Sequence, residues 1–558
     1  MKKLIIVWPW LATILSGLLY TLCLPPFDQS WLCWFALTPL IAAIWFSENT
    51  ARHRWVRNLL LGYVAGLTFF WTAFSWLTTV TVLGWFVLQF YMAIYFAIWA
   101  WFCGLVQPRE IRRESGSTKW DQMLDRARVT AAPLKSPWTK STNNLLLAFL
   151  LAAAWVAQEW LRGWMFSGFG WNGLGVPLHG TWPLIQVAEF TGVAGLSFMV
   201  AFANVIALTT VRRLFIEART RVVRPHFDVT LTLAAIVGVL TFGVRAVQIS
   251  PPTKELRVAA VQSNVPQDQK FDPQFTSKIF ERFRRLSEIA LRSDPPPDLL
   301  IWPESSMPGP VLADRESNQF VMDLATSAES DLLLGTIDVQ NGDVYNAALL
   351  VSDGGEQVQV YRKLHLVPFG EYVPGRHRFP LLARIVGDQV PGDFKSGKDY
   401  TLFELTSSDV YVAPLICFED TIGELARRFV LPTETSPGAN LLVDITNDAW
   451  FLKSAGSHQH LANAVFRCVE TRRPMVRAAN TGVTCFVNQF GRVTQVLRDD
   501  TGSTFTEGVL TGEIKIPTEH ELTFYARHGE LFAKVCAGIM LLAILLSVLR
   551  QSMRKNAH

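Results

Sequence analysis

The sequence has little charge for its length and no clustered cysteines. Of its 558 residues, 18% are charged and 50% are hydrophobic, and the formal net charge is only +4. This composition excludes a disordered chain and a wholly water-soluble protein, and so small a net charge predicts no nucleic-acid partner. The seven scattered cysteines form no Cys-x-x-Cys pair, and no glycine-rich phosphate loop follows a predicted strand. We therefore expect no disulfide scaffold, no metal and no cofactor.

Apolar runs separated by short polar breaks fill the first 250 residues, and one more lies near the C-terminus. Each approaches the roughly 20 residues that an α-helix needs to cross about 30 Å of hydrocarbon. The first run follows two lysines, as in a signal peptide, but no small-residue cleavage pattern comes after it. The second run is short and contains Pro39. We predict about eight transmembrane helices, at residues 4–24, 30–47, 58–79, 84–106, 144–162, 190–211, 229–248 and 531–549.

Lysine and arginine occur in alternate breaks, and this alternation predicts the orientation of the chain. Because positively charged loops stay in the cytoplasm, the N-terminus is predicted to be cytoplasmic and the large block after residue 250 to lie outside the membrane. The charges concentrate at 52–57, 107–143, 212–224 and 550–555, and the breaks at 25–29 and 80–83 contain none. The predicted domains are a membrane domain at 1–250, an extracytoplasmic domain at 251–525, and a C-terminal transmembrane helix with a cytoplasmic tail at 526–558.

Two segments of the membrane part allow two interpretations each. The basic loop 107–143 is typical of a solvated connector attracted to anionic lipid headgroups, and an RNA- or partner-binding segment is the alternative. The aromatic stretch 164–172, with Trp182 nearby, falls on the outer side. Aromatic residues at that level are typical of an interfacial belt, whereas the two glycines within the stretch favour a shaped loop that shares in a lipid-binding cleft.

From Leu256 onward the pattern changes to short β-branched runs that alternate with polar helical stretches. Most of these runs are continuously apolar, as strands buried on both faces are, so we expect a layered α/β sandwich. Helices are predicted at 273–292, 421–429 and 458–471. Strands are predicted at Val258–Gln262, Leu299–Trp302, Leu332–Gly335, Ala347–Val351, Tyr411–Ile416, Leu441–Ile445 and Met475–Ala478.

Three strand ends in this block carry reactive residue types: the carboxylate of Glu304, the ammonium of Lys363 and the thiol of Cys417. A thiol needs a base to become a thiolate, and a carboxylate in a suitable pocket can take its proton. A lysine ammonium can then stabilise the oxyanion of a tetrahedral intermediate. Singly, each residue would be an ordinary buried or surface group; together they suffice for acyl transfer. Cys468 and Cys485 are interpreted as structural, and Cys417 is expected to remain unpaired.

Whole motifs surround these residues in a fixed order. They are Trp302-Pro-Glu304, Tyr361-Arg-Lys363 with Val367-Pro-Phe-Gly-Glu371-Tyr-Val-Pro374, and Ile416-Cys417-Phe-Glu419. The motifs resemble those of the carbon–nitrogen hydrolase (nitrilase) superfamily, whose signature is a Glu-Lys-Cys triad on an αββα sandwich. With its membrane spans, the chain resembles the membrane-embedded branch of that superfamily, the apolipoprotein N-acyltransferases, over nearly its whole length.

The resemblance implies a two-step acyl transfer at a bacterial inner membrane, with the catalytic domain on the periplasmic side. Cys417 takes a fatty acyl chain from a membrane phospholipid, expected to be phosphatidylethanolamine, as a thioester. The α-amino group of the N-terminal S-diacylglyceryl-cysteine of an apolipoprotein then takes that chain. In this scheme Glu304 is base and then acid, and Lys363 stabilises the oxyanion with the backbone N–H of Phe418.

The resemblance also assigns supporting roles. Glu371 and Glu419 would hold Lys363 and orient the pocket, or would act only as structural salt-bridge carboxylates. Substrate binding is assigned to Phe271, Asn346, Trp450 and Trp171. The Pro- and Gly-rich segment 374–398 is interpreted as a lid over the site, and a rigid insertion is the alternative.

The chain departs from the family pattern at four places. Phe271 stands where the family usually has Trp, Phe418 where it often has Tyr, and Gly170 where it usually has Pro. The loop 107–143 is also longer than usual. None of these departures touches the triad, but contacts with lipid chains or headgroups could differ.

Two other functions would use the same features. A membrane-tethered amidase or nitrilase would keep the triad and use water as acceptor, yet hydrolysis of a small amide needs no polytopic membrane half. A transporter with a receptor-like outer domain would need intramembrane charges along a pathway. Glu159 and Glu189, near span ends, are the only weak candidates for such charges.

Overall fold

The computed structural model describes residues 2–47, 53–108, 137–221, 223–249, 251–328, 330–374, 376, 393–406 and 408–555. The chain divides into two compact units, one formed by Met1–Arg245 with Glu530–His558 and the other by Ala246–Gly529. Most of the predicted loop 107–143 and of the predicted lid 374–398 lies outside the described residues.

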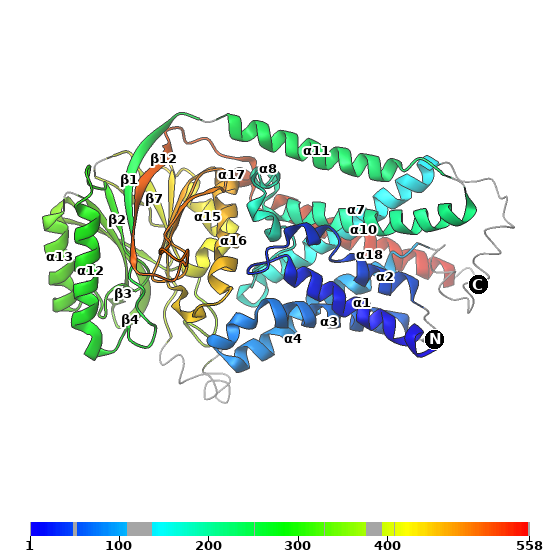
Figure 1. Ribbon diagram of the computed structural model, residues 1–558, viewed down its shortest axis with the longest axis horizontal. Helices are drawn as coiled ribbons and strands as arrows, with labels where there is room; N and C mark the ends of the chain where they lie inside the picture. Colours follow the sequence, from blue (N-terminus) through cyan, green and yellow to red (C-terminus); the bar gives the residue numbers. More distant parts are fainter. Residues whose placement is uncertain are drawn as a thin grey trace. The chain divides into compact units, whose positions relative to one another are not determined.

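The first unit is helical (Figure 1), and each of the eight predicted apolar runs forms helix. Among the described residues, five helices are long and apolar enough to cross a membrane, and the apolar helices at Ile6–Leu22 and Ser30–Phe46 are shorter. The helices that correspond to the eight apolar runs are α1 (Lys2–Leu22), α2 (Thr38–Phe46), α3 (Arg54–Ala73), α4 (Val82–Leu105), α7 (Pro137–Trp164), α10 (Val193–Thr220), α11 (Phe227–Gln248) and α18 (Leu531–Lys555). Short turns join them at η1 (Ser30–Trp34), η2 (Ser75–Thr79), η3 (Met165–Ser167), η4 (Val176–Gly180), α8 (Trp182–Ile185) and α9 (Ala188–Thr191).

Small residues and stacked rings hold the helices of the first unit together. A Cβ on Gly62 of α3 would overlap the backbone of α4 at Phe96, so glycine is required for this close approach. Small residues at such contacts are typical of helix packing in lipid, where close van der Waals contact replaces the hydrophobic effect. Tyr20 of α1 stacks on Phe69 of α3 with ring centroids 3.9 Å apart.

The second unit contains two six-stranded mixed sheets. The first has the strand order β12-β1-β2-β3-β4-β5 and the second the order β11-β10-β9-β8-β7-β6. Three neighbouring strands of each sheet are parallel, β1-β2-β3 in the first and β9-β8-β7 in the second, and the other pairings are antiparallel. The strands of the first sheet are β1 (Thr253–Gln262), β2 (Leu299–Ile301), β3 (Asp331–Gln340), β4 (Asp343–Ser352), β5 (Gln357–Arg362) and β12 (Gly508–Pro517). Those of the second are β6 (Phe403–Glu404), β7 (Tyr411–Ile416), β8 (Leu441–Thr446), β9 (Met475–Ala479), β10 (Cys485–Val487) and β11 (Val493–Val496).

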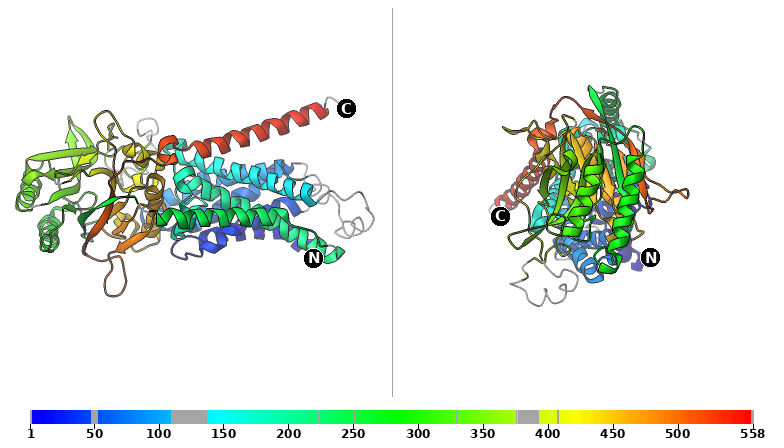
Figure 2. Two further views of the ribbon diagram at one scale, coloured as in Figure 1. Left: turned by 90° about the horizontal axis from the view of Figure 1, so that it is seen from above. Right: turned by 90° about the vertical axis from the view of Figure 1, so that its left-hand side faces the viewer.

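Helices cover the outer face of each sheet, which confirms the predicted αββα sandwich. Figure 2 (right view) shows α12 (Thr276–Leu291) and α13 (Arg315–Ser327) side by side over the first sheet. Their apolar residues pack with Trp302 and the strands in one buried core, and the Trp302 indole N–H donates to Ser287 at 3.0 Å. The second sheet is covered by α15 (Gly423–Val430) and α16 (Gly456–Thr471), with α17 (Phe524–His528) beside them. Short turns are η5 (Pro273–Phe275), η6 (Asp353–Gly355), η7 (Cys417–Thr421) and η8 (Asp448–Phe451).

All seven predicted strands and all three predicted helices of this unit are present within a few residues of their expected bounds. The predicted ranges include neither the helices α13 and α17 nor the short strand β10 and the four edge strands β5, β6, β11 and β12. An edge strand is open to solvent on one side and alternates polar with apolar residues, so no continuous apolar run marks its position in the sequence.

Candidate active site

The three reactive residues lie at strand ends that the two sheets bring together. Glu304 follows β2, Lys363 directly follows β5, and Cys417 directly follows β7. The Nζ of Lys363 lies 3.9 Å from Oε1 of Glu304. The Cys417 thiol interacts electrostatically with both of these charges. The structure therefore places the predicted carboxylate, ammonium and thiol in one site.

Lys363 is held as a buried cation between two carboxylates. Its side chain is 1% exposed, and Nζ lies 2.9 Å from Oε1 of Glu371. Burial opposes the charge, but Glu371 and Glu304 outweigh burial and raise the pKa of Lys363 above its usual value. A lysine that keeps its proton can stabilise negative charge but cannot take a proton from the thiol. The base must therefore be a different group.

Asn346 of β4 joins the two carboxylates. Its Nδ2 donates to Oε1 of Glu304 and to Oε1 of Glu371, both at 2.7 Å. Oε2 of Glu371 accepts the backbone N–H of Val367 at 2.8 Å. The amide of Asn346 therefore orients the two carboxylates. The role in substrate binding that the resemblance implies for Asn346 stays a prediction.

Cys417 occupies a sharp turn between β7 and η7. Its φ of 56° lies in the left-handed region, where a non-glycine side chain is strained, as is common at functional sites. Burial and the charge of Glu304 raise the pKa of the thiol well above its usual value, whereas Lys363 and a hydrogen bond with Thr446 lower it. The thiol therefore needs a base in contact with it to become nucleophilic.

Glu419 supports the site through the backbone. It is fully buried, and its Oε1 accepts the N–H groups of Leu364 and His365 at 2.8 and 3.0 Å. Its Oε2 accepts the N–H of Ile416 at 2.9 Å, and the hydroxyl of Tyr361 donates to both oxygens. Burial raises the pKa of Glu419 to about 7. One carboxylate thus links the chain after Lys363 to the chain before Cys417.

A buried charge network beneath the Cys417 turn was not assigned a role from the sequence. His460 of α16 lies 2.9 Å from Asp420 and 3.0 Å from Asp448. Arg477 of β9 lies 3.1 Å from Asp444 and 3.2 Å from Asp448. Although burial opposes it, Asp420 raises the pKa of His460 to about 10, so the imidazole is charged. The network ties the turns η7 and η8 to α16 and to the strands β8 and β9 of the second sheet.

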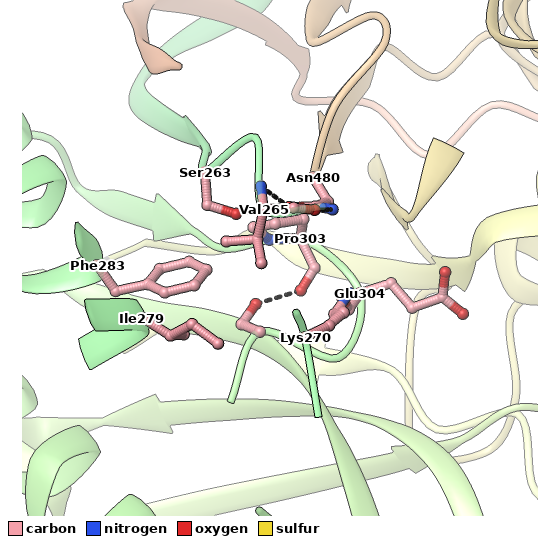
Figure 3. Close-up of a pocket in the computed structure, with 9 residues that line it drawn as sticks. Ser263, Val265, Lys270, Ile279, Phe283, Pro303, Glu304 and Asn480 are labelled. Carbon is pink, nitrogen blue, oxygen red and sulfur yellow. Dashed lines mark hydrogen bonds between the residues drawn. The ribbon is translucent and has the colours of Figure 1, made fainter. Parts of the chain in front are cut away.

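Lys270, for which the sequence predicted no role, lies next to Glu304. It is 4% exposed, and its Nζ donates to the backbone oxygen of Glu304 at 2.7 Å. Figure 3 shows the narrow pocket that both residues line, with the carboxylate of Glu304 pointing away from Ile279 and Phe283. The only sequence signal for Lys270 was its position before Phe271.

The remaining predicted residues lie in varied surroundings. Phe418 is buried, with its ring stacked on His365 at 5.8 Å. Phe271 and Trp450 are 47% and 44% exposed. Trp171 belongs to the helical unit, where it is buried against Trp76. The predicted substrate-binding roles of the exposed aromatic residues and of Trp171 stay predictions.

Two family models match the chain in sequence order. The model described as the apolipoprotein N-acyltransferase N-terminal domain matches residues 16–206, and that described as carbon–nitrogen hydrolase matches residues 257–522. A solved carbon–nitrogen hydrolase superfamily protein from Xanthomonas campestris is 16% identical and covers 47% of this chain and 91% of that chain, with a TM-score of 0.36.

Curated relatives match over both units. An apolipoprotein N-acyltransferase from Geobacter metallireducens is 32% identical over 552 residues, which cover 96% of this chain and 95% of that protein. An apolipoprotein N-acyltransferase from Bradyrhizobium diazoefficiens is 28% identical over 592 residues, covering 99% of this chain and 97% of that protein. With both domains matched in order and a relative of this identity aligned over nearly its full length, the chain belongs to the apolipoprotein N-acyltransferase family.

Proposed function

We propose that this protein transfers a fatty acyl chain from a membrane phospholipid, through a thioester on Cys417, to the α-amino group of the N-terminal S-diacylglyceryl-cysteine of apolipoproteins. The observation that carries the proposal is the meeting of Glu304, Lys363 and Cys417 in one site of a chain that also has a helical unit with membrane-spanning helices. Both substrates are anchored in lipid, so their reaction requires a catalyst that reaches the membrane. The family names support transfer over hydrolysis by water.

In the first step, Glu304 takes the proton of the Cys417 thiol, and the thiolate attacks the carbonyl carbon of the phospholipid ester. The oxyanion that forms is stabilised by the ammonium of Lys363 and by the backbone N–H of Phe418. Collapse of the tetrahedral intermediate breaks the ester C–O bond. Glu304 returns the proton to the leaving alkoxide, and lysophospholipid departs.

In the second step, the neutral α-amino group of the lipoprotein attacks the thioester carbonyl. Glu304 takes a proton from the attacking nitrogen, and the same cation and N–H stabilise the second oxyanion. Collapse breaks the C–S bond, and the sulfur recovers the proton from Glu304. The products are an amide and the free thiol, so the enzyme returns to its starting state without a cofactor.

We further propose that the protein lies in the bacterial inner membrane with its catalytic unit on the periplasmic side. Lysine and arginine in alternate breaks support this orientation. Phosphatidylethanolamine is the proposed donor, as the family resemblance implies.

The direct test is mass spectrometry of the Cys417 peptide after the full chain, in detergent, is incubated with phosphatidylethanolamine carrying a labelled acyl chain. We expect one added acyl group on Cys417, which a diacylated lipopeptide with a free α-amino group discharges as labelled amide. Hydrolysis of the Cys417 thioester by water, at the same rate as acyl transfer to the lipopeptide, would favour the membrane-tethered amidase instead. Absence of any acyl group on Cys417 would contradict the proposal.

Replacing Asn346 with leucine is expected to slow acyl transfer about tenfold or more. The substitution removes both 2.7 Å hydrogen bonds that hold Glu304 and Glu371, and hydrogen bonds to charged groups contribute about 1.5–3 kcal/mol each. The rate of thioester formation measures the effect. Gln340→Leu, at an exposed position on β3, is the matched control and should keep the native rate. Equal rates of thioester formation in the two variants would show that Asn346 does not orient the carboxylates of Glu304 and Glu371.

A further inference from the structure

A second lysine is buried beside the proposed base. The Nζ of Lys270 donates to the backbone oxygen of Glu304 at 2.7 Å, and its charge interacts with the Glu304 carboxylate and with Cys417. Its hydrogen bond goes to the backbone of Glu304, and the Glu304 carboxylate acts on it through charge alone. A buried ammonium whose hydrogen bond goes to a neutral carbonyl is costly in free energy, so its presence within the site calls for a function.

The formal charges of the site show what a second cation would supply. Glu304 and Glu371 both face Lys363, at 3.9 and 2.9 Å. Two carboxylates against one ammonium leave one negative charge close to Cys417, which opposes formation of a thiolate. The ammonium of Lys270 offsets that charge.

Support of the backbone does not by itself explain Lys270. The turn after β2 is already fixed to β3, since the N–H of Ser306 donates to Gly335 at 2.8 Å and that of Gly335 donates to Pro303 at 3.2 Å. A Cβ on Gly335 would lie 2.6 Å from the Cα of Glu304, so the turn packs directly on this strand. A neutral donor would complete the remaining hydrogen bond without the cost of burying a charge.

We propose that Lys270 is a positioning residue of the active site, which fixes the main chain at Glu304 and supplies a second positive charge that favours the Cys417 thiolate. The inference rests on the proposed function, because it takes Cys417 as the nucleophile and Glu304 as its base. The charged and titratable groups that face the thiol are then Glu304, Lys363, Asp448 and Lys270.

The test compares Lys270→Met, Lys270→Gln and the native protein by the rate at which N-ethylmaleimide alkylates Cys417, followed by mass spectrometry of its peptide from pH 6.5 to 9. We expect both variants to react about tenfold more slowly at pH 7, the effect of moving a thiol titration by about one pH unit. Burial lowers the pKa of Lys270 to about 8, so the native protein loses this cation above that pH. The ratio of native to variant rates should therefore shrink toward one between pH 7 and 9.

Lys270→Gln separates charge from hydrogen bonding, since glutamine keeps an N–H donor but has no charge. Native alkylation in Lys270→Gln, or a ratio that does not change with pH, would overturn the proposal in favour of a purely structural role. Lys278→Met, at an exposed lysine of α12, is the matched control and should alkylate as the native protein does. If the native protein accepts no acyl group on Cys417, the proposed function fails instead, independently of the alkylation rates.

Discussion

Cys417→Ala is expected to abolish N-acylation of a diacylated lipopeptide, with a loss on the order of 10⁴-fold or more, as when the nucleophile of an acyl-transfer enzyme is removed. The sulfur is the only group in the proposed scheme that carries the acyl chain between the two substrates. The variant should still fold, because the thiol has no disulfide partner and alanine removes one atom. Transfer of labelled acyl chain to the lipopeptide measures the loss, and thermal unfolding in detergent checks the fold.

Cys468→Ala is the matched control for this experiment. Cys468 lies in the same unit on α16 and is fully buried, so its loss tests the removal of a cysteine without touching the strand ends. We expect near-native transfer and a slightly lower unfolding temperature. Retained acylation by Cys417→Ala, with the fold intact, would show that the acyl chain travels by another route.

Lys363→Arg is expected to lower the rate of thioester formation by about 10²–10³-fold, the usual cost of losing one oxyanion-stabilising group. The lysine side chain is 1% exposed, and its Nζ approaches Glu371 at 2.9 Å and Glu304 at 3.9 Å. A planar guanidinium is larger than an ammonium and cannot place its charge at the same point in this space. Single-turnover formation of the Cys417 thioester is the appropriate measurement.

Lys395→Arg provides the control for a change of cation type. The Lys395 side chain is 59% exposed, so arginine fits there without repacking, and the native rate is expected. Near-native thioester formation in Lys363→Arg would mean that the lysine only supports the fold. Loss of the folded state would be visible as a lower unfolding temperature, and Lys363→Met would then separate charge from size.

The elements that carry the triad could be located from the sequence because buried parallel strands are continuous apolar runs. The predicted strand Tyr411–Ile416 has the same bounds as β7, and the thiol follows it directly. The helices of the first unit could be predicted equally well, since a helix that crosses the hydrocarbon layer requires an uninterrupted apolar stretch of sequence. The edge strands, with one solvated side, carry no such signal, and β5 was therefore missed although Lys363 follows it.

The role of a residue could not be predicted from the sequence where that role depends on a contact between segments that are distant along the chain. The substrate-binding role expected for Asn346 stays a prediction, and the position of its amide between Glu304 and Glu371 could not be predicted from the sequence. Glu419 was expected to hold Lys363 and orient the pocket; its charge acts on Lys363, and its backbone hydrogen bonds lie on both sides of the site, a placement that only the folded chain determines. Apart from its position before Phe271, nothing in the local sequence distinguishes Lys270 from a solvated lysine.

The order of apolar runs and reactive residue types was sufficient to predict the two structural classes, the strands before Glu304 and Cys417, and the acyl-transfer chemistry, because each depends on short-range periodicity or on the identity of a side chain. Tertiary structure alone decided which carboxylate faces which cation and which lysine is buried. Those choices arise from the packing of one sheet against another, where electrostatic energies depend on distances of a few ångströms between residues more than a hundred positions apart in the sequence.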